Sequence, residues 1–425
     1  MLSPRLPVGL ALAILEMSTV GGARERQARP TEDRENRLAP SKKNATAEDL
    51  ESLALALGID FRRQDPSAEH PTREDLDAYR KADFGSWLEA QLKNADDSIA
   101  PPPASVQNFL SSRQPTVWRA AGLLERDVPE WDLDPRKGSK DLGALLGAVG
   151  LNRILLSAAL VEEKAGHHAQ AGNLLEASWS LSRSFAGQPD WTAQLISVTL
   201  LKLQAGALRK MAEPPTPWVD RLSGDEPRRR MLDLLEESPP LGRSPEELSL
   251  EEVRLAQARA WRSVADRLRE LSPCEVAKLS SEEIWKPAAE EIEQSLAAGA
   301  DPSLKTLSDM ATPNLTGAIR RAGRLLVDSE LTAKVLELRQ EKAASRDGRW
   351  PEKLFDGDSR VCPGAAYEYQ SRGGAMSIRF KGPIDDPGAP ALGLPLSFES
   401  RPPRATPTPT PARTRRATTP SRPHT

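Results

Sequence analysis

The residue types most able to do chemistry are scarce in this sequence, beginning with its two cysteines, Cys274 and Cys362. They are too far apart along the chain for the short spacing of a local zinc site. In an oxidising compartment they could form one disulfide between a helical region and a later hairpin, whereas in a reducing cytoplasm they would be two unrelated thiols. As a nucleophile, Cys362 would need a histidine base beside it, and spacing alone does not supply that geometry.

Histidine is almost as rare, and only His70, His167, His168 and His424 carry it. His167 and His168 are adjacent, and neighbouring residues on a turn point in different directions. Metal-binding histidines usually stand four residues apart on a helix face or within a cysteine-rich cluster. We therefore interpret this pair as an exposed helix turn and expect no metal site there.

The other polar clusters favour solvated surfaces over active sites. Carboxylate pairs fall on expected helices at Glu162-Glu163, Glu282-Glu283 and Glu290-Glu291. A calcium site at Asp385-Asp386 would need several more converging oxygens. Arg228-Arg229-Arg230 is mixed with acidic residues, so we expect no nucleic-acid partner. The sequence has no P-loop, no G-x-G-x-x-G after a strand and no G-x-S-x-G, and we assign no catalytic residue, cofactor or metal.

Composition points to helices. The chain has 425 residues and a net charge of −3, which favours neither nucleic acid nor an anionic membrane. The stretch 401–425 holds six arginines and no acid, which leaves −9 (−3 minus +6) on the rest. Alanine, leucine, glutamate and arginine dominate while β-branched residues are sparse, a balance typical of an α-rich fold.

Hydrophobic periodicity predicts three successive helices in the middle of the chain, over Lys140–Ala165, Ala169–Ala186 and Trp191–Met211. The third is apolar almost all round, which predicts a central, buried helix. Nearer the N-terminus, Thr46 is expected to cap a first helix and Thr72 a second, which continues without a break through Tyr79, Phe84, Trp87 and Leu92.

Pro313 is expected to begin the last long helix, because its missing N–H is harmless in a first turn. Asp347-Gly348 should end that helix, and Trp350-Pro351 should lead onward in an extended conformation. Alternating stretches at 366–370 and 376–380, joined by a turn at Gly373-Gly374, then predict a β-hairpin, and 392–398 could add an edge strand.

Two stretches of the sequence each resemble a known kind of protein. The helix between Pro313-Asn314-Leu315 and Gly348-Arg349-Trp350-Pro351 resembles poorly characterised bacterial envelope proteins, whose C-terminal end is similar to the globular part of type II secretion pseudopilins. The resemblance implies a small antiparallel sheet packed on that helix. In addition, Gly166, His168, Ala171 and Leu175 resemble one tetratricopeptide (TPR) unit, although a solenoid needs about three such units.

The first 23 residues fit a secretory signal peptide. Arg5 gives a basic start, Leu6–Leu15 an apolar run, and Gly21-Gly22-Ala23 a small-residue end. We therefore expect a periplasmic or secreted protein, with a cytoplasmic location as the alternative. The apolar run is too short to span a bilayer, and we expect no transmembrane segment.

We predict a mainly α fold, a helical-hairpin bundle or array with a small C-terminal β-hairpin subdomain and disordered termini. The expected boundaries are a signal peptide over 1–23, a disordered linker over 24–44, an α-helical domain over 45–345, the hairpin subdomain over 346–400 and a disordered tail over 401–425. The expected function is non-catalytic interaction or scaffolding in the envelope, with an unknown protein partner and an unknown oligomeric state. The alternatives are a hydrolase with a site between the helices and the hairpin, or a cytoplasmic helical adaptor with a basic tail.

Overall fold

The computed structural model describes residues 43–61, 69–131, 142–188, 191–212, 217–224, 226–237, 251–299, 303–384 and 393–400. The fold is mainly α-helical, with a small antiparallel sheet near the C-terminal end, as the sequence predicts. The predicted signal peptide, nearly all of the linker and the basic tail lie outside the described residues. No described helix is both long and apolar enough to cross a membrane.

The described chain opens with α3 (Ala45–Ala56), α4 (Arg73–Ala82), α5 (Phe84–Lys93) and α6 (Ala104–Arg126). The expected Thr46 cap is wrong, because the side chain of Asn44 accepts the hydrogen bond from the Ala47 N–H and caps α3. Asparagine is among the strongest N-cap residues, and it stands one position before the first helical residue. Thr46 instead donates its hydroxyl to Asp127, 3.0 Å away.

The expected continuous helix after Thr72 is also wrong, since the chain breaks between α4 and α5 at Asp83. Thr72 does cap α4, by accepting the Asp75 N–H at 3.1 Å. Asp83, however, adopts a left-handed conformation with φ 49°, which an α-helix cannot contain. Its carboxylate then accepts the Ser86 N–H and caps α5, so this residue ends one helix and begins the next.

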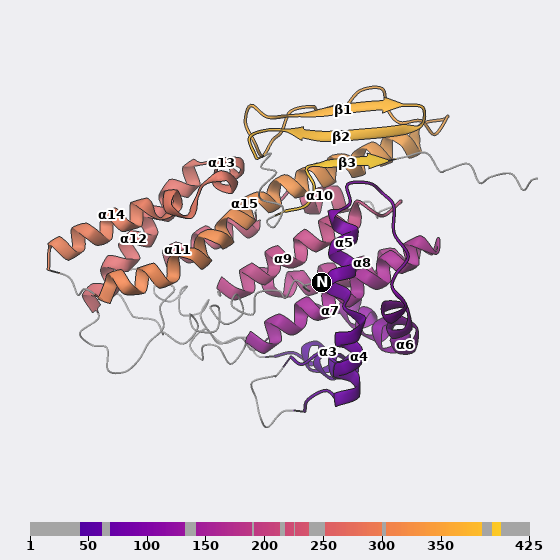
Figure 1. Ribbon diagram of the computed structural model, residues 1–425, viewed down its shortest axis with the longest axis horizontal. Helices are drawn as coiled ribbons and strands as arrows, with labels where there is room; N and C mark the ends of the chain where they lie inside the picture. Colours follow the sequence, from indigo (N-terminus) through magenta and orange to yellow (C-terminus); the bar gives the residue numbers. More distant parts are fainter. Residues whose placement is uncertain are drawn as a thin grey trace, which may run out of the picture.

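The three central helices are α7 (Leu142–Lys164), α8 (His168–Ala186) and α9 (Trp191–Leu208), close to the expected bounds. α9 is buried on nearly every side, and α8 packs antiparallel to it while α7 packs beside both (Figure 1). This block contains the largest hydrophobic core of the described chain, which α3 to α6 also line. The helical hairpins are present, while their kinship to tetratricopeptide repeats stays a prediction.

A second group of helices forms an arm on the other side of α15 (Figure 1). It consists of α11 (Glu226–Glu237), α12 (Glu251–Glu270), α13 (Pro273–Lys278) and α14 (Ser281–Ala297). The short helix α10 (Trp218–Leu222), which precedes them, packs against α8 and α15 and belongs to the core of the central block. Ser272 and Ser280 begin α13 and α14 with complete capping boxes, in which the serine and a glutamate three residues later bond each other's backbone. The short helices α10 and α13 carry too few residues for a periodic signal, and the sequence analysis missed both.

α15 (Ser303–Ala344) is the long helix that joins both groups and the sheet (Figure 1). It begins ten residues before Pro313, so the prediction that Pro313 opens the helix is wrong. A proline in a helix interior removes one hydrogen bond and costs about 3 kcal/mol. Packing outweighs that cost, because Leu315 and Ile319 bury against α12 and α14 just after the proline. Pro115 and Pro287 also lie inside helices, α6 and α14.

The sheet has the strand order β1 (Ala366–Arg372), β2 (Ala375–Lys381) and β3 (Ser397–Ser400), with antiparallel neighbours. Arg372 pairs with Ala375, so Gly373 and Gly374 alone form the turn. Both glycines have positive φ, as a two-residue hairpin turn with the twist of the strands requires. The expected edge strand is shorter than predicted and begins after Pro395, which has no N–H for a ladder.

Candidate binding groove

The Gly348-Arg349-Trp350-Pro351 segment fastens the sheet to the end of α15. Gly348, with φ 63°, turns the chain back, and Trp350 then donates its indole N–H to the Gly374 carbonyl in the hairpin turn at 3.1 Å. The Pro351 carbonyl accepts the hydroxyls of Tyr369 and Ser371 at 2.8 and 3.0 Å. Arg349 is exposed and pairs with Asp347, 3.2 Å away. This motif therefore has a structural role.

At the other end of the resemblance, Leu315 is buried against α12 and α14. The side chains of Pro313 and Asn314 lie outside the described residues, as do Asp385 and Asp386.

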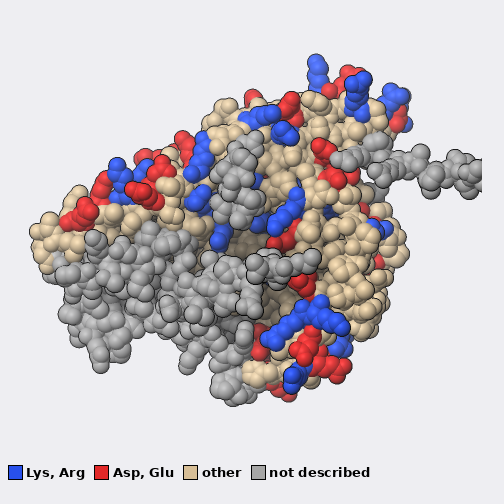
Figure 2. All heavy atoms as spheres, in the orientation of Figure 1, with Lys and Arg blue, Asp and Glu red and all other residues tan. Residues whose placement is uncertain are grey.

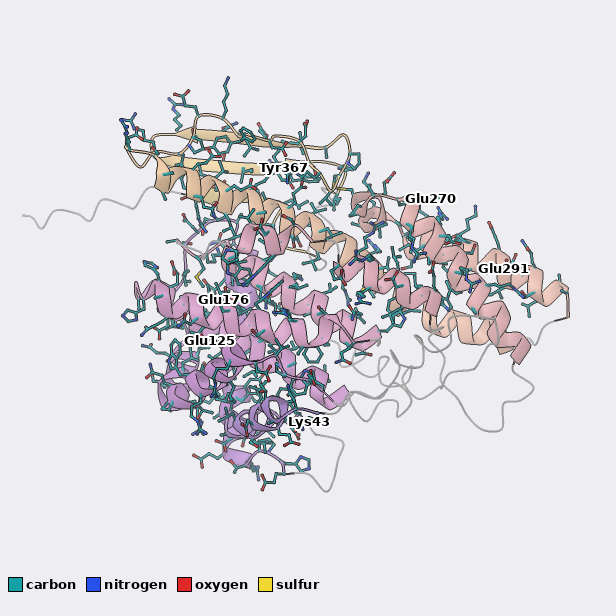
Figure 3. All side chains as sticks on the ribbon, turned by 180° about the vertical axis from the view of Figure 1, so that it is seen from behind. Lys43, Glu125, Glu176, Glu270, Glu291 and Tyr367 are labelled. Atoms are coloured by element: carbon teal, nitrogen blue, oxygen red, sulfur yellow. A yellow bond between two sulfur atoms is a disulfide. The ribbon has the colours of Figure 1, made fainter. Side chains whose placement is uncertain are left out.

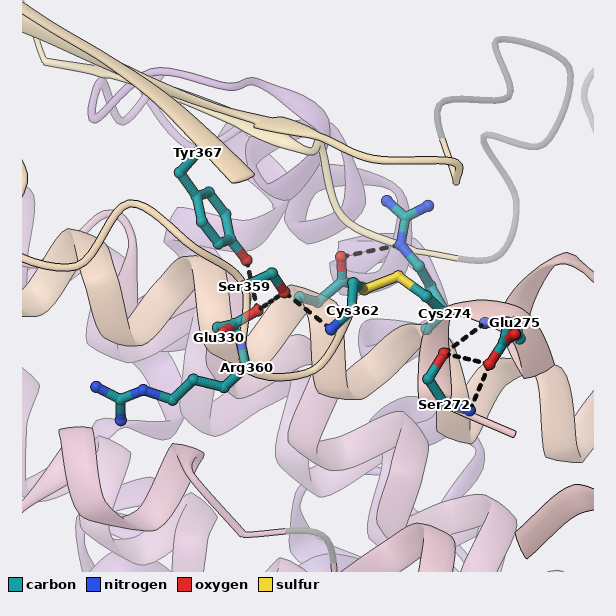
Figure 4. Close-up of a disulfide and its surroundings, with 10 residues drawn as sticks. Ser272, Cys274, Glu275, Glu330, Ser359, Arg360, Cys362 and Tyr367 are labelled. Atoms are coloured by element: carbon teal, nitrogen blue, oxygen red, sulfur yellow. Dashed lines mark hydrogen bonds and ion pairs between the residues drawn. A yellow bond between two sulfur atoms is a disulfide. The ribbon is translucent and has the colours of Figure 1, made fainter. Parts of the chain in front are cut away.

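A disulfide joins Cys274 on α13 to Cys362, in the loop before β1, with the Cα atoms 5.2 Å apart. Both cysteines belong to the core between α15 and the sheet. Figure 4 shows the same loop tied to α15 by Glu330. That carboxylate accepts the Ser359 hydroxyl at 2.5 Å and the Tyr367 hydroxyl at 2.9 Å. Tyr367 lies between the sheet and α15 (Figure 3), and burial together with Glu330 raises the pKa of its hydroxyl.

Buried charges hold the segment that leads into β3. Asp328 on α15 is fully buried and accepts Arg324 Nε at 3.1 Å and the Leu394 N–H at 3.0 Å. Arg209, at the end of α9, donates to the Thr332 hydroxyl and to the carbonyls of Asp328 and Pro395 at 2.6 to 2.8 Å. Burial lowers the pKa of Arg209 to about 10, and Asp328 opposes that shift. These bonds fix β3 over the junction of α9 and α15.

A groove of about 610 Å³ opens where the ends of α7, α9 and α15 meet the β-subdomain. It is lined by side chains from the loop after α5, the three helix ends, the Trp350 segment and β3. Its charged lining residues are Asp97, Glu163, Lys164, Lys210, Arg339 and Lys342. This is where the hydrolase alternative placed its site, and we call this cavity the junction groove.

Three of the four cations that line the junction groove bond to backbone carbonyls. Arg339 donates to the carbonyls of Leu208, Arg209 and Met211, and so satisfies the C-terminal end of α9. Lys210 donates to the carbonyls of Asn94 and Asp96 at 3.0 and 2.5 Å. In the same way, Lys164 donates to the Ile99 carbonyl at 2.5 Å. These cations offset the negative ends of helix dipoles and set the shape of the groove.

The fourth cation, Lys342, is placed differently. It lies in the last turn of α15 with its ammonium 4.3 Å from the centre of the Trp350 ring. A cation over an indole face gains about 0.5 to 1 kcal/mol at an exposed site and keeps its hydrogen-bond donors available. The apolar side chains of Ile99, Ala212 and Ala343 lie in the same lining. Lys342 and Trp350 therefore present one charged and one aromatic contact to a bound chain.

The acids of the groove are held by neighbours. Glu163 accepts the Ala212 N–H at 2.7 Å and contacts His168 Nδ1 at 2.9 Å. Asp97 accepts the Ser400 hydroxyl at 2.6 Å. A hydrolase triad would need the serine hydroxyl on the histidine, whereas here each bonds a different carboxylate. The hydrogen bonds therefore position the walls and leave no nucleophile beside a base among the lining residues.

The two adjacent histidines bond to different acids, as neighbours on a turn would. His167 Nδ1 lies 2.7 Å from Glu162, and His168 contacts Glu163. Gly166, with φ 83°, makes the turn before them. Within the described ranges no group of three or more His, Cys, Asp or Glu side chains is arranged to hold a metal ion.

Of the charged residues that line the junction groove, only Glu163 was singled out from the sequence, together with the uncharged lining residue His168. A usable signal existed, because Arg209-Lys210 directly follows the most apolar helix of the chain. Charged residues at the end of a buried helix must find partners or line a cavity. Which carbonyls they reach depends on elements more than 100 residues apart, such as Arg339 and Leu208 with a sequence separation of 131.

No family model, no curated protein and no solved structure matches this chain. The likeness to envelope proteins therefore rests on the segments Pro313-Asn314-Leu315 and Gly348-Arg349-Trp350-Pro351 alone.

Proposed function

We propose that the protein is a non-catalytic interaction protein of the bacterial envelope, and that the junction groove receives a segment of a partner protein. The observation that carries the proposal is the bonding of the groove. Its buried polar groups are engaged with the fold, while Lys342, Trp350 and the apolar residues beside them face the cavity. Rigid walls with one aromatic anchor are typical of a preformed binding site.

The chemistry of the lining indicates what kind of segment fits. Counting Lys164, Lys210, Arg339 and Lys342 against Asp97 and Glu163, the lining carries +2 (four minus two). Lys342 is the lining cation that makes no hydrogen bond or ion pair with another described residue, and it lies beside the face of Trp350. A peptide with one acidic side chain next to an apolar one would satisfy both contacts.

The disulfide supports an envelope location. Structural disulfides persist in the periplasm and outside the cell, and they are rare in the cytoplasm. Cys274 and Cys362 are buried beside each other in the core under the sheet, where a reductant would have poor access. The apolar run at the N-terminus supports the same location.

A photo-crosslinking experiment tests the groove. A benzophenone amino acid at Ala343, which is exposed and lines the groove, should give a discrete adduct with one protein in intact cells. Adding the groove-charge substitution Lys342→Glu should abolish that adduct. The matched control is the same probe at Ala344, which is also exposed on α15 but does not line the groove. Equal adducts from both positions would reject the groove as the binding site.

Localisation is tested separately. The full-length chain is expressed with its own N-terminus, the cells are fractionated, and the mature N-terminal residue and cysteine state are determined by mass spectrometry. A start near Arg24 in the periplasmic or secreted fraction, with Cys274 and Cys362 oxidised, is the expected result. An intact Met1 and reduced thiols in the cytoplasm would favour the adaptor alternative instead.

A further inference from the structure

An exposed aromatic side chain lies on the loop between Trp350 and β1. Among the residues that the structure describes, two large hydrophobic side chains are exposed, Leu146 at 49% and Phe355 at 97%. Phe355 therefore has almost no contact with its own chain. We call residues 352–358, which include it, the Phe355 loop. A single exposed apolar side chain is ordinary on a protein surface, so its meaning depends on how the loop holds it and on what lies nearby.

The Phe355 loop is fixed to the fold on both sides of the phenyl ring. Before the ring, Leu354 packs partly buried against the core under the sheet. After it, the Asp356 carbonyl accepts Lys334 Nζ from α15 at 2.7 Å, and the Gly357 carbonyl accepts an N–H of β1 at 2.6 Å. A loop held in this way presents its aromatic side chain in one place, so little ordering is left to be done when another molecule binds.

The chemistry of the Phe355 loop complements that of the junction groove. The loop reads EKLFDGD, and its one lysine and three acids give a charge of −2 (one minus three), against +2 for the groove lining. Phe355 directly precedes Asp356, so the loop offers an apolar side chain next to an acidic one. The groove offers Trp350 and Lys342, with the ammonium 4.3 Å from the ring centre. Asp356 contacts the exposed Arg360 at 3.2 Å, a surface ion pair that is weak enough to exchange.

This complementarity is local. Figure 2 shows acidic and basic side chains projecting together around the sheet, so no field of a single sign covers this end of the molecule. The groove and the loop also adjoin, because Trp350 and Phe355 are five residues apart and an extended chain of that length spans no more than about 18 Å. Two complementary patches that adjoin on one surface can meet twice across a twofold axis, which closes the assembly as a dimer.

We propose that the segment received by the junction groove is the Phe355 loop of a second copy of this chain, and that each copy places its loop in the groove of the other. This inference rests on the function proposed above and names its partner. Phe355 packs beside Trp350, and an acid of the loop contacts Lys342. An aromatic anchor enclosed in a cavity with a charged contact beside it is the usual centre of a binding interface.

Photo-crosslinking of the purified full-length chain tests the identity of the partner. With a benzophenone amino acid at Ala343 and no other protein present, the expected adduct has twice the monomer mass and contains the Phe355 loop as the crosslinked peptide. A probe chain that also carries Phe355→Ala should give no adduct alone. It should regain the adduct when unlabelled wild type is added, because the loop then comes from the other copy. An adduct of monomer mass would place the loop in its own groove and overturn the proposal.

The same probe separates this inference from the function on which it rests. An adduct with a different protein in intact cells, together with none from the purified chain, would overturn the second copy as the partner and leave the groove as a binding site. No adduct in either setting would overturn both.

Sedimentation equilibrium measures the dimer directly. Phe355→Ala should raise the dissociation constant at least roughly thirtyfold, as loss of a central aromatic contact does. Leu146→Ala, which truncates the other exposed hydrophobic side chain, is the matched control and should leave the constant unchanged. Since Phe355 is exposed, its removal should also leave the helical circular dichroism unchanged. A monomeric wild type, equal constants for wild type and Phe355→Ala, or assemblies that grow beyond a dimer with concentration would each overturn the proposal.

Discussion

Arg209, Arg324 and Asp328 meet in the interior between α9 and α15, where they replace hydrophobic contacts with a network of hydrogen bonds. The network reaches the backbone of Leu394 and Pro395, so it fixes a stretch of chain far away in sequence. Part of this was accessible from sequence, because Arg324, Asp328 and Thr332 repeat at four-residue spacing inside an apolar stripe. Their partners were not, because spacing within one helix does not specify what packs on it.

Neutralising Asp328 should be costly. Asp328→Asn leaves Arg324 and Arg209 buried without a counter-charge and turns one acceptor into a donor facing the Leu394 N–H. Breaking a buried pair in this way costs about 3 to 5 kcal/mol. Urea unfolding should report that loss. Asp233→Asn, which breaks an exposed pair with Arg269 at 3.2 Å, should cost less than about 1 kcal/mol, and equal losses would contradict the burial argument.

Lys210 predicts a pH dependence. Burial lowers its pKa from 10.5 to about 8, although Asp96 and Asp97 oppose the shift. Between pH 8 and 10.5 the unfolded chain therefore holds a proton that the native protein has lost, and stability rises with pH. Below pH 8 the charged form carries its full burial penalty in the native state.

The measurement is the difference in unfolding free energy between wild type and Lys210→Met. It should be constant below pH 7.5 and then move in favour of the wild type by roughly 2 kcal/mol by pH 9.5. The corresponding difference for the exposed Lys81→Met should stay flat. A flat profile for Lys210 as well would mean that its two carbonyl bonds fully offset the burial.

At the scale of elements, periodicity predicted the helices and the hairpin well, because each has a repeating pattern of its own. α7, α8 and α9 lie within a few residues of the expected bounds, and the hairpin turn is Gly373-Gly374. The errors occurred where tertiary contacts override a local rule. Pro313 lies inside α15 because the residues after it are buried, and Asp83 divides two helices because its side chain caps the second.

Two glycines of α15 test how closely its neighbours pack. A Cβ at Gly323 would lie 2.8 Å from the Pro273 carbonyl of α13, whereas one at Gly317 would meet nothing within 4 Å. Gly323→Ala should therefore push α13 away and destabilise the protein by about 1 to 3 kcal/mol. Gly317→Ala should stabilise it by roughly 0.5 to 1 kcal/mol through helix propensity alone. The melting temperatures of the two variants should shift in opposite directions. If both rise, α13 moves aside to accommodate the added Cβ without loss of stability.

The whole molecule brings together parts of the chain that no local pattern connects. The junction groove combines the loop after α5, three helix ends and β3, and Asp97 bonds Ser400 across 303 residues. A site between the helices and the hairpin was one expectation from the sequence, whereas the residues that line the groove could not be predicted from it. The helix ends bring their own unsatisfied carbonyls, and only the assembled fold shows that Lys210 bonds the carbonyl at the end of α5 and Arg339 those at the end of α9.

The same long-range assembly makes the disulfide a test of the molecule as a whole. Cys274 and Cys362 are separated by 88 residues and join the helical arm to the loop that leads into the sheet. Closing a loop of that length stabilises a protein by about 4 to 5 kcal/mol in the chain-entropy account. Dithiothreitol should therefore lower the melting temperature of the wild type to that of a variant with both cysteines changed to alanine.

That double variant is the control, because dithiothreitol should leave its own melting temperature unchanged. Since α15 and the sheet share a core and the Glu330 bonds, the reduced protein should keep its helical circular dichroism at low temperature. Comparing the wild type with the double variant separates the contribution of the disulfide bond to stability from the contribution of packing. A wild type that is insensitive to reduction, with free thiols by mass spectrometry, would place the stability of this junction in the apolar core alone.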